Sequence, residues 1–151
     1  SGFAGKVWLD VEDNPSPGCS WTAAPPAQQC VFLRELVAVL QQQAVSVGVY
    51  SNAHEWASTV GADCALQGEY ALDLWYAHYD DSPSFDDFAA FGGWSSPAIK
   101  QYKGDSTSCG VAASASTIGT DDASTISMAR ALGSVRLRCA VPSGPCAASR
   151  H

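Results

Sequence analysis

Four short apolar segments, each ending in polar or aromatic side chains, constrain the fold of this chain more than any other feature. They are rich in β-branched and aromatic residues, which favour strands, and they cover residues 7–11, 46–50, 73–79 and 97–102. A helical pattern follows the first segment and another follows the second. This order predicts an α/β fold with a mainly parallel sheet and flanking helices.

The stronger helical pattern covers residues 29–44. Its apolar residues recur at the spacing of one helix face and are Val31, Leu33, Leu36, Val37 and Leu40. We expect this stripe to face the sheet, while Arg34, Glu35 and the glutamines after Leu40 face water.

Two further helices are predicted from their ends. Ser51 and Asn52 provide a cap for a helix that Gly61 would end. Later in the chain, Asp121 and Asp122 supply the negative charge that favours the first turn of a helix. We expect that helix to continue to Leu132.

Asp10 and Glu12 end the first apolar segment, VWLDVED. Alternation along a strand places both carboxylates on one face, roughly 7 Å apart at the backbone, so they can flank one substrate bond. Crowding in a partly dry cleft raises the pKa of one carboxyl group and leaves the other ionised, which suits glycoside hydrolysis. The alternative is that both are solvated residues at a strand end, or that they cap the next loop.

Polar and aromatic residues also end the other three segments. Because sites in parallel sheets lie at the carboxyl ends of strands, we expect these side chains to line one cleft. Aromatic rings beside carboxylates fit a sugar, which has apolar faces and polar rims. The candidates are Tyr50, Trp75, Tyr76, Tyr79, Asp80, Gln101 and Tyr102. Any single ring can instead belong to the core, and His78 is expected to be a hydrogen-bonded structural histidine rather than a base.

Six cysteines point to an oxidising compartment. Zinc ligation is the alternative, but no C-x-x-C pair occurs and the three histidines are dispersed, so disulfides are favoured. The expected pairs are Cys19 with Cys30, Cys64 with Cys109, and Cys139 with Cys146.

The charge balance limits the partners of the chain. Eight lysines and arginines stand against fifteen aspartates and glutamates, a formal net charge of -7. This balance argues against nucleic acid and against a polybasic membrane anchor. No apolar run approaches the roughly 18 residues that span a bilayer. We expect a monomeric protein, secreted or lysosomal or phagosomal, without a metal or another cofactor.

Several strings resemble the family 25 glycoside hydrolases, lysozymes that cleave peptidoglycan, and their amoebal and invertebrate branch above all. They are VWLDVEDNP, FLRELV, VGVYSNAHEW, LWYAHYDDSPSFDDFAAFGGW and SPAIKQYKGD, and they cover roughly residues 5–111. The resemblance implies a modified (β/α) barrel of the TIM type. Only part of one is expected, because 151 residues are fewer than the roughly 250 of a complete barrel.

The resemblance also implies a reaction. It is retaining hydrolysis of the β-1,4 bond between N-acetylmuramic acid and N-acetylglucosamine, by a neighbouring-group mechanism. Glu12 would be the acid/base, and Asp10 would orient and stabilise the substrate acetamido group that attacks the sugar carbon. Asp80 matches a further active-site acid. The residues that match the sugar-binding groove are Tyr50, Trp75, Tyr79 and Gln101.

The family also has a first strand with its own aspartate before the D-x-E motif. Here the motif begins at residue 10, so the first barrel strands are expected to be absent. We expect a partial barrel domain over residues 1–111 and a divergent tail over residues 112–151. Two alternatives to a lysozyme stay open: a catalytically inactive glycan-binding or fragmentary barrel protein, and a small disulfide-rich secreted protein without a role in sugar chemistry.

Overall fold

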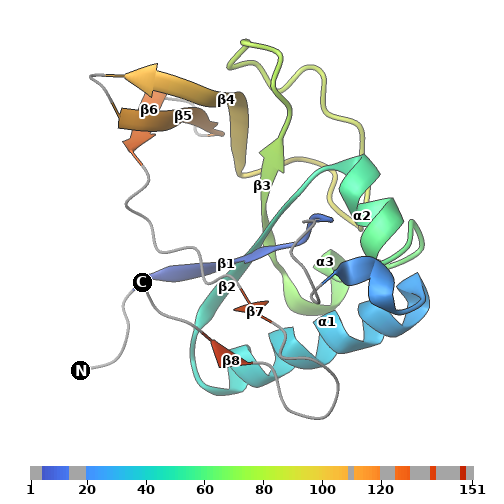
Figure 1. The fold of residues 1–151 in the computed structure, drawn as a ribbon. Helices are drawn as coiled ribbons and strands as arrows, with labels where there is room; N and C mark the ends of the chain where they lie inside the picture. The colour runs from blue at the N-terminus through green and yellow to red at the C-terminus, as the bar shows by residue number, and fades with distance from the viewer. Residues whose placement is uncertain are drawn as a thin grey trace.

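The computed structural model describes residues 5–13, 20–108, 111–119, 125–129, 137–138 and 147–148 (Figure 1). Its main sheet has six strands in chain order. They are β1 (Lys6–Asp10), β2 (Ser46–Ser51), β3 (Asp73–Ala77), β4 (Ile99–Ser108), β5 (Val111–Ile118) and β6 (Thr125–Ala129). A separate two-stranded sheet pairs β7 (Leu137–Arg138) with β8 (Ala147–Ala148).

The first four strands are parallel neighbours, and the last three form an antiparallel meander. The four strands that the sequence predicts are therefore confirmed, as is the mainly parallel order of that part of the sheet. β4 is longer than predicted and bends at two register irregularities between Gln101 and Ser106. Figure 1 shows the meander turning away from the β1–β3 part of the sheet.

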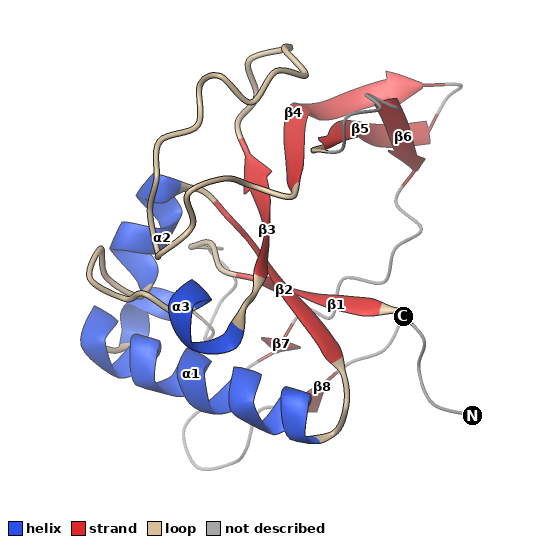
Figure 2. Ribbon diagram, turned by 180° about the vertical axis from the view of Figure 1, so that it is seen from behind, coloured by secondary structure: helices blue, strands red, loops and turns tan. Residues whose placement is uncertain are grey.

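The helices α1 (Pro26–Gln42), α2 (Ala53–Thr59) and α3 (Gln67–Tyr70) gather on one side of β1–β3 (Figure 2). A short 3-10 turn, η1 (Trp21–Ala23), precedes α1. Pro26 opens α1 at a position where a proline's missing N–H costs nothing. None of the helices in the described part of the chain is long and apolar enough to cross a bilayer.

The apolar face of α1 differs from the prediction at one residue. Leu33 and Val37 are buried, and Cys30 completes the stripe. Val31 is 50% exposed, so its predicted place against the sheet is wrong. At about 100° per residue, Val31 lies on the side of the helix opposite to Leu33.

The predicted cap of α2 is confirmed. The Asn52 side chain accepts a hydrogen bond of 2.9 Å from the Glu55 N–H. The helix ends at Thr59, and Gly61 follows with a φ of 92°, which a residue with a side chain rarely adopts.

One core fills the space between the sheet and the helices. Leu9, Val49 and Leu74 contribute from successive strands, and all are buried. Trp56 of α2 is fully buried against Trp94, with ring centroids 5.0 Å apart. The core fixes which face of each strand points away from the helices, and that opposite face carries the candidate site.

A disulfide joins Cys30 of α1 to Cys64, which follows α2. Their Cα atoms are 5.9 Å apart, and both residues are buried. The predicted pairs of Cys30 with Cys19 and of Cys64 with Cys109 are therefore wrong. The two helical segments pack on the same side of the sheet, which brings together cysteines 34 residues apart in sequence. The third predicted pair, Cys139 with Cys146, lies outside the described residues.

The helix predicted from Asp121 to Leu132 is wrong over Thr125–Ala129, because these residues form β6 and pair antiparallel with β5. The segment begins with the β-branched pair Thr125 and Ile126, which favours a strand when a neighbouring edge is open. The remaining residues of the predicted helix lie outside the described part.

Candidate active site

The candidate site begins with three residues in register on neighbouring strands. Asp10 pairs with Tyr50, and Tyr50 pairs with Trp75. Since side chains alternate along a strand, these three point to the face opposite Leu9, Val49 and Leu74. Parallel strands therefore place a carboxylate and two aromatic rings side by side near the carboxyl end of the sheet.

Tyr50, Tyr79 and Gln101 form a hydrogen-bonded group, here called the tyrosine cluster. The Tyr50 hydroxyl donates to Gln101 Oε1 at 2.7 Å, and the Tyr79 hydroxyl donates to the same oxygen at 3.3 Å. The two hydroxyl oxygens are 3.0 Å apart. Tyr79 is 59% exposed. Three of the four predicted groove residues thus share one polar contact, and one of them offers an open aromatic ring.

The fourth predicted groove residue, Trp75, packs edge-on against Tyr50, with ring centroids 5.4 Å apart. Trp8 packs against Trp75 in the same way at 5.7 Å. Gly48 makes this possible, because a Cβ there would overlap the Trp8 ring. Trp8 was not among the predicted site residues, although alternation from Asp10 puts it on the same face.

The backbone between Asp10 and Glu12 is held by β2. The Val11 N–H donates to the Tyr50 carbonyl at 2.9 Å. The Val11 carbonyl accepts a hydrogen bond of 2.7 Å from the Ser51 hydroxyl, and Ser51 is only 1% exposed. Both polar groups of the central residue of the D-x-E motif are therefore fixed.

A second contact holds the chain just after Glu12. The Asp13 N–H donates to the Glu55 carboxylate of α2 at 2.8 Å, and the Ser20 hydroxyl donates to the Asp13 carboxylate at 2.9 Å. Sequence reasoning gave no sign of the Ser51 and Glu55 contacts, because both residues also fit an ordinary helix start.

The negative charges of both carboxylates act on the tyrosine cluster. The pKa of Tyr50 is raised far above its ordinary value, first by burial and then by the hydrogen bond with Tyr79. The negative charges of Glu12 and Asp10 raise it further. Tyr50 therefore stays a neutral donor, and the two carboxylates lie close enough for their charge to act on its hydroxyl.

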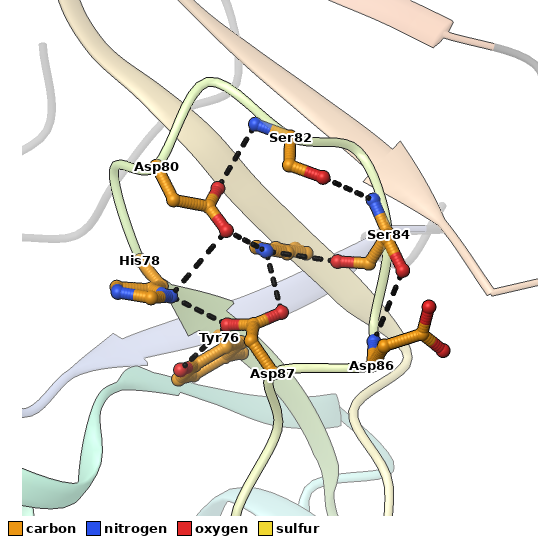
Figure 3. Close-up of polar contacts among 8 residues, drawn as sticks. Tyr76, His78, Asp80, Ser82, Ser84, Asp86 and Asp87 are labelled. Carbon is orange, nitrogen blue, oxygen red and sulfur yellow. Dashed lines mark hydrogen bonds and ion pairs between the residues drawn. The ribbon is translucent and has the colours of Figure 1, made fainter.

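Asp80 belongs to a different group, here called the lysine clamp: Lys100 with Asp80, Ser84 and Asp87 (Figure 3). The Lys100 ammonium donates to Asp80 Oδ2 at 2.8 Å, to the Ser84 carbonyl at 2.8 Å and to Asp87 Oδ1 at 2.6 Å. The lysine side chain is 0% exposed. The hydrogen bond from Lys100, helped by the Ser82 N–H, lowers the pKa of Asp80.

The same contacts shift the pKa values of the other charged groups of the clamp. Burial favours the neutral form of Asp87, but hydrogen bonds from Lys100 and His78 outweigh it and lower its pKa to about 2. Burial also opposes the charge of Lys100, yet its bonds to Asp80 and Asp87 raise its pKa overall. The clamp is therefore a set of charges that stay ionised together at neutral pH.

His78 is hydrogen-bonded, as the sequence suggested, because its Nδ1 contacts the Asp87 carboxylate. The Tyr76 hydroxyl donates to the same carboxylate at 3.2 Å, and burial, followed by the Asp87 charge, raises the Tyr76 pKa to about 12. His78, Asp80 and Asp87 lie close enough together to ligate a metal ion. However, the Lys100 ammonium is bonded to both carboxylates, and its charge would repel a cation.

The family model described as Lysozyme-like protein 1 matches residues 3–102. The chain belongs to the lysozyme-like proteins of glycoside hydrolase family 25. Among its relatives in Dictyostelium discoideum, Counting factor 45-1 is 41% identical over 116 residues, covering 76% of this chain and 36% of that protein. Probable GH family 25 lysozyme 4 is 41% identical over 107 residues, covering 71% of this chain and 46% of that protein. This lysozyme-like chain thus spans less than half the length of both relatives.

A solved structure supports the fold of the lysozyme-like chain. The muramidase from Trichobolus zukalii superposes with a TM-score of 0.59 at 17% identity, over 76% of this chain and 50% of that one. The expected modified TIM-like architecture is therefore confirmed for the part of a barrel that this chain provides.

Proposed function

We propose that this chain supplies the catalytic carboxylates of a lysozyme that hydrolyses the β-1,4 bond between N-acetylmuramic acid and N-acetylglucosamine in peptidoglycan, with retention of configuration. The observation that carries the proposal is the juxtaposition of the D-x-E carboxylates with the tyrosine cluster. Hydrolysis needs a proton donor and negative charge beside the sugar carbon, and binding needs an open aromatic surface with polar groups at its edge.

The two carboxylates have different roles in this proposal. Glu12 donates a proton to the leaving sugar oxygen and later removes one from water. Asp10 orients the substrate acetamido group and stabilises its positive charge as the acetamido oxygen attacks the sugar carbon. The fixed backbone around Val11 supports these roles, because proton transfer needs donor and acceptor within hydrogen-bond reach.

The aromatic residues supply the groove. Tyr79 stacks on a sugar ring, while Tyr50 and Gln101 provide hydrogen bonds at the edge of that ring. Trp75 supports Tyr50 from beside it. Asp80 is the second candidate for an active-site acid, but its bond to Lys100 favours a fixed negative charge over proton transfer.

The test replaces each carboxylate by its amide and measures the release of reducing ends from purified peptidoglycan. Glu12→Gln should lower the rate by at least about 100-fold, because general acid catalysis contributes 100- to 10,000-fold. Asp10→Asn should lower it by a similar factor, because the amide loses the charge that stabilises the transition state. Glu35→Gln, an exposed change on α1, is the matched control and should keep the full rate. If Glu12→Gln keeps most of the rate, Asp80→Asn becomes the deciding variant.

A catalytically inactive glycan-binding protein is the second candidate, since the exposed Tyr79 ring and the hydrogen-bonding groups of Tyr50 and Gln101 can bind a sugar without any proton transfer. Binding of peptidoglycan fragments without hydrolysis supports that candidate. Absence of both binding and hydrolysis contradicts both. For either function we propose a secreted, lysosomal or phagosomal location, where bacterial walls are met and the Cys30–Cys64 disulfide is stable.

A further inference from the structure

Lys100 is a buried charge that the proposed reaction does not use. Lysines rarely lose all contact with water unless they are paired, yet this one is 0% exposed. An ammonium has three hydrogen-bond donors, and three acceptors meet it: Asp80, Ser84 and Asp87. All three belong to the loop that follows β3 (Figure 3). A fully buried lysine with a partner for each of its three donors fixes the loop that carries these partners.

That loop begins next to the exposed ring of the tyrosine cluster. Tyr79 directly precedes Asp80, and its ring lies beside β4 at Gly104, where an added Cβ would be 3.4 Å from the ring. Because Tyr79 is 59% exposed, burial does little to hold it. The backbone is tied to β4 by one hydrogen bond on either side of Tyr79, from the His78 N–H to the Gln101 carbonyl at 3.0 Å and from the Asp81 N–H to the Tyr102 carbonyl at 2.9 Å.

We propose that Lys100 is a positioning residue for Tyr79: by holding Asp80 and Asp87, it fixes the loop that presents the Tyr79 ring to a bound sugar. Lys100 touches no substrate in this proposal and acts through Tyr79. The statement about the sugar rests on the proposed function, whereas the statement about the loop does not.

The chain offers a matched control. Lys103 lies on the same strand and pairs with Asp81 of the same loop at 3.4 Å, but its side chain is 53% exposed and that of Asp81 is 77% exposed. Exposed pairs of this kind contribute little. Lys103→Met thus removes a lysine–carboxylate contact to the loop without removing the clamp.

The first experiment follows amide hydrogen exchange without any ligand. In Lys100→Met, the Asp81 amide should exchange at least about 10-fold faster than in the wild type, because charged hydrogen bonds are lost. Amides of β1 and β2 should speed up no more than the loss of global stability accounts for, and Lys103→Met should change the Asp81 rate less than about 2-fold. Unchanged protection of Asp81 in Lys100→Met overturns the proposal.

A second variant covers the case in which Lys100→Met does not fold. The triple change of Lys100→Met with Asp80→Asn and Asp87→Asn leaves no uncompensated charge, and neutral replacement of a buried ion pair often preserves stability. It should show the same faster exchange at Asp81. Full protection in the folded triple variant also overturns the proposal.

The second experiment measures binding of the tetrasaccharide of N-acetylglucosamine by calorimetry. Lys100→Met should weaken the affinity about 5- to 10-fold, which is the size of one lost hydrogen bond or stacking contact. Tyr79→Ala should weaken it by at least as much, and the double variant should bind no more weakly than Tyr79→Ala alone, because Lys100 acts through Tyr79. If the two losses add in full, Lys100 does not act through Tyr79.

A kinetic readout completes the test, because a general loss of structure would lower kcat as well. Lys100→Met should raise KM for peptidoglycan while kcat stays within about 3-fold, since Asp10 and Glu12 are untouched. A wild-type chain that binds no glycan contradicts the proposed function and the sugar part of this inference. The exchange rate of Asp81 then decides the loop part by itself.

Discussion

The tyrosine cluster and the lysine clamp use adjacent residues of the same two segments, yet they differ in every physical respect. Tyr79 and Gln101 belong to the first, and their neighbours Asp80 and Lys100 belong to the second. The first consists of neutral groups around an exposed ring, and the second consists of charges around a fully buried ammonium. The difference teaches that adjacent residues of one strand can contribute to an open, neutral face and to a charged group around a buried ammonium on the reverse side.

The largest expected difference between the two groups is in stability. Lys100→Met should lower the free energy of unfolding by about 3 kcal/mol, the lower end of the range for breaking a buried ion pair. We choose the lower end because the Asp80 and Asp87 side chains are still 26% and 24% exposed. Tyr79→Phe should lower it by less than about 1 kcal/mol. Urea unfolding of both variants measures these losses of free energy. Equal losses would contradict the expectation that the lysine clamp contributes more to stability than the tyrosine cluster does.

A smaller effect is expected on the site face alone. Gly48→Ala places a methyl group where the Trp8 ring lies, and overpacking of this kind costs about 1–3 kcal/mol. The displaced ring should disturb Trp75 and Tyr50 but leave the clamp unchanged. Near-ultraviolet circular dichroism of the tryptophans should therefore change, while the Asp81 amide keeps its exchange rate. Faster exchange at Asp81 in this variant would show that the two groups are not separable.

The smallest effect is expected in the dependence of stability on pH. The pKa of Asp87 is lowered to about 2, so its contribution is complete above the ordinary aspartate pKa of about 3.9 and is lost as the pH falls towards 2. The loss should be about 1 kcal/mol once solvent screening is allowed for. Other acids also titrate in this range, so the quantity to measure is the difference between the wild type and Lys100→Met. Denaturant unfolding at pH 5, 3 and 2 gives the free energy of unfolding as a function of pH. Its decrease towards low pH should be smaller or reversed in the variant, and the same decrease in both proteins would contradict the pairing of Lys100 with Asp87.

Much of the fold follows from sequence because it depends on periodic patterns. The β1–β4 strands and α1 are each marked by the spacing of their apolar residues, and the shared face of Asp10, Tyr50 and Trp75 follows from alternation. Trp8 could have been placed by the same rule. The catalytic and sugar-binding roles assigned to these residues stay predictions.

The features that sequence reasoning missed depend on contacts between distant segments. Cys30 pairs with Cys64 because two helical segments meet, and no spacing rule contains that contact. The sequence does not predict the hydrogen-bond partners of Lys100, since Asp80 lies 20 residues away and Asp87 lies in an irregular loop. The strand at Thr125–Ala129 was not predicted, because its pairing with the edge of β5 outweighs a local preference for helix.

Lys100 and Gln101 point to opposite faces of β4. The face that each one occupies therefore depends on the number of residues that precede it in the strand. Deleting one residue just before Lys100 would turn the ammonium towards the proposed sugar-binding face and the glutamine towards Asp80 and Asp87, because a shift of one position reverses every side chain of a strand. Many substitutions in residues 97–101 would alter one group at a time, whereas a single insertion or deletion just before Lys100 would exchange the two. We therefore expect related chains to vary in residue type along this strand while keeping the number of residues before Lys100 constant.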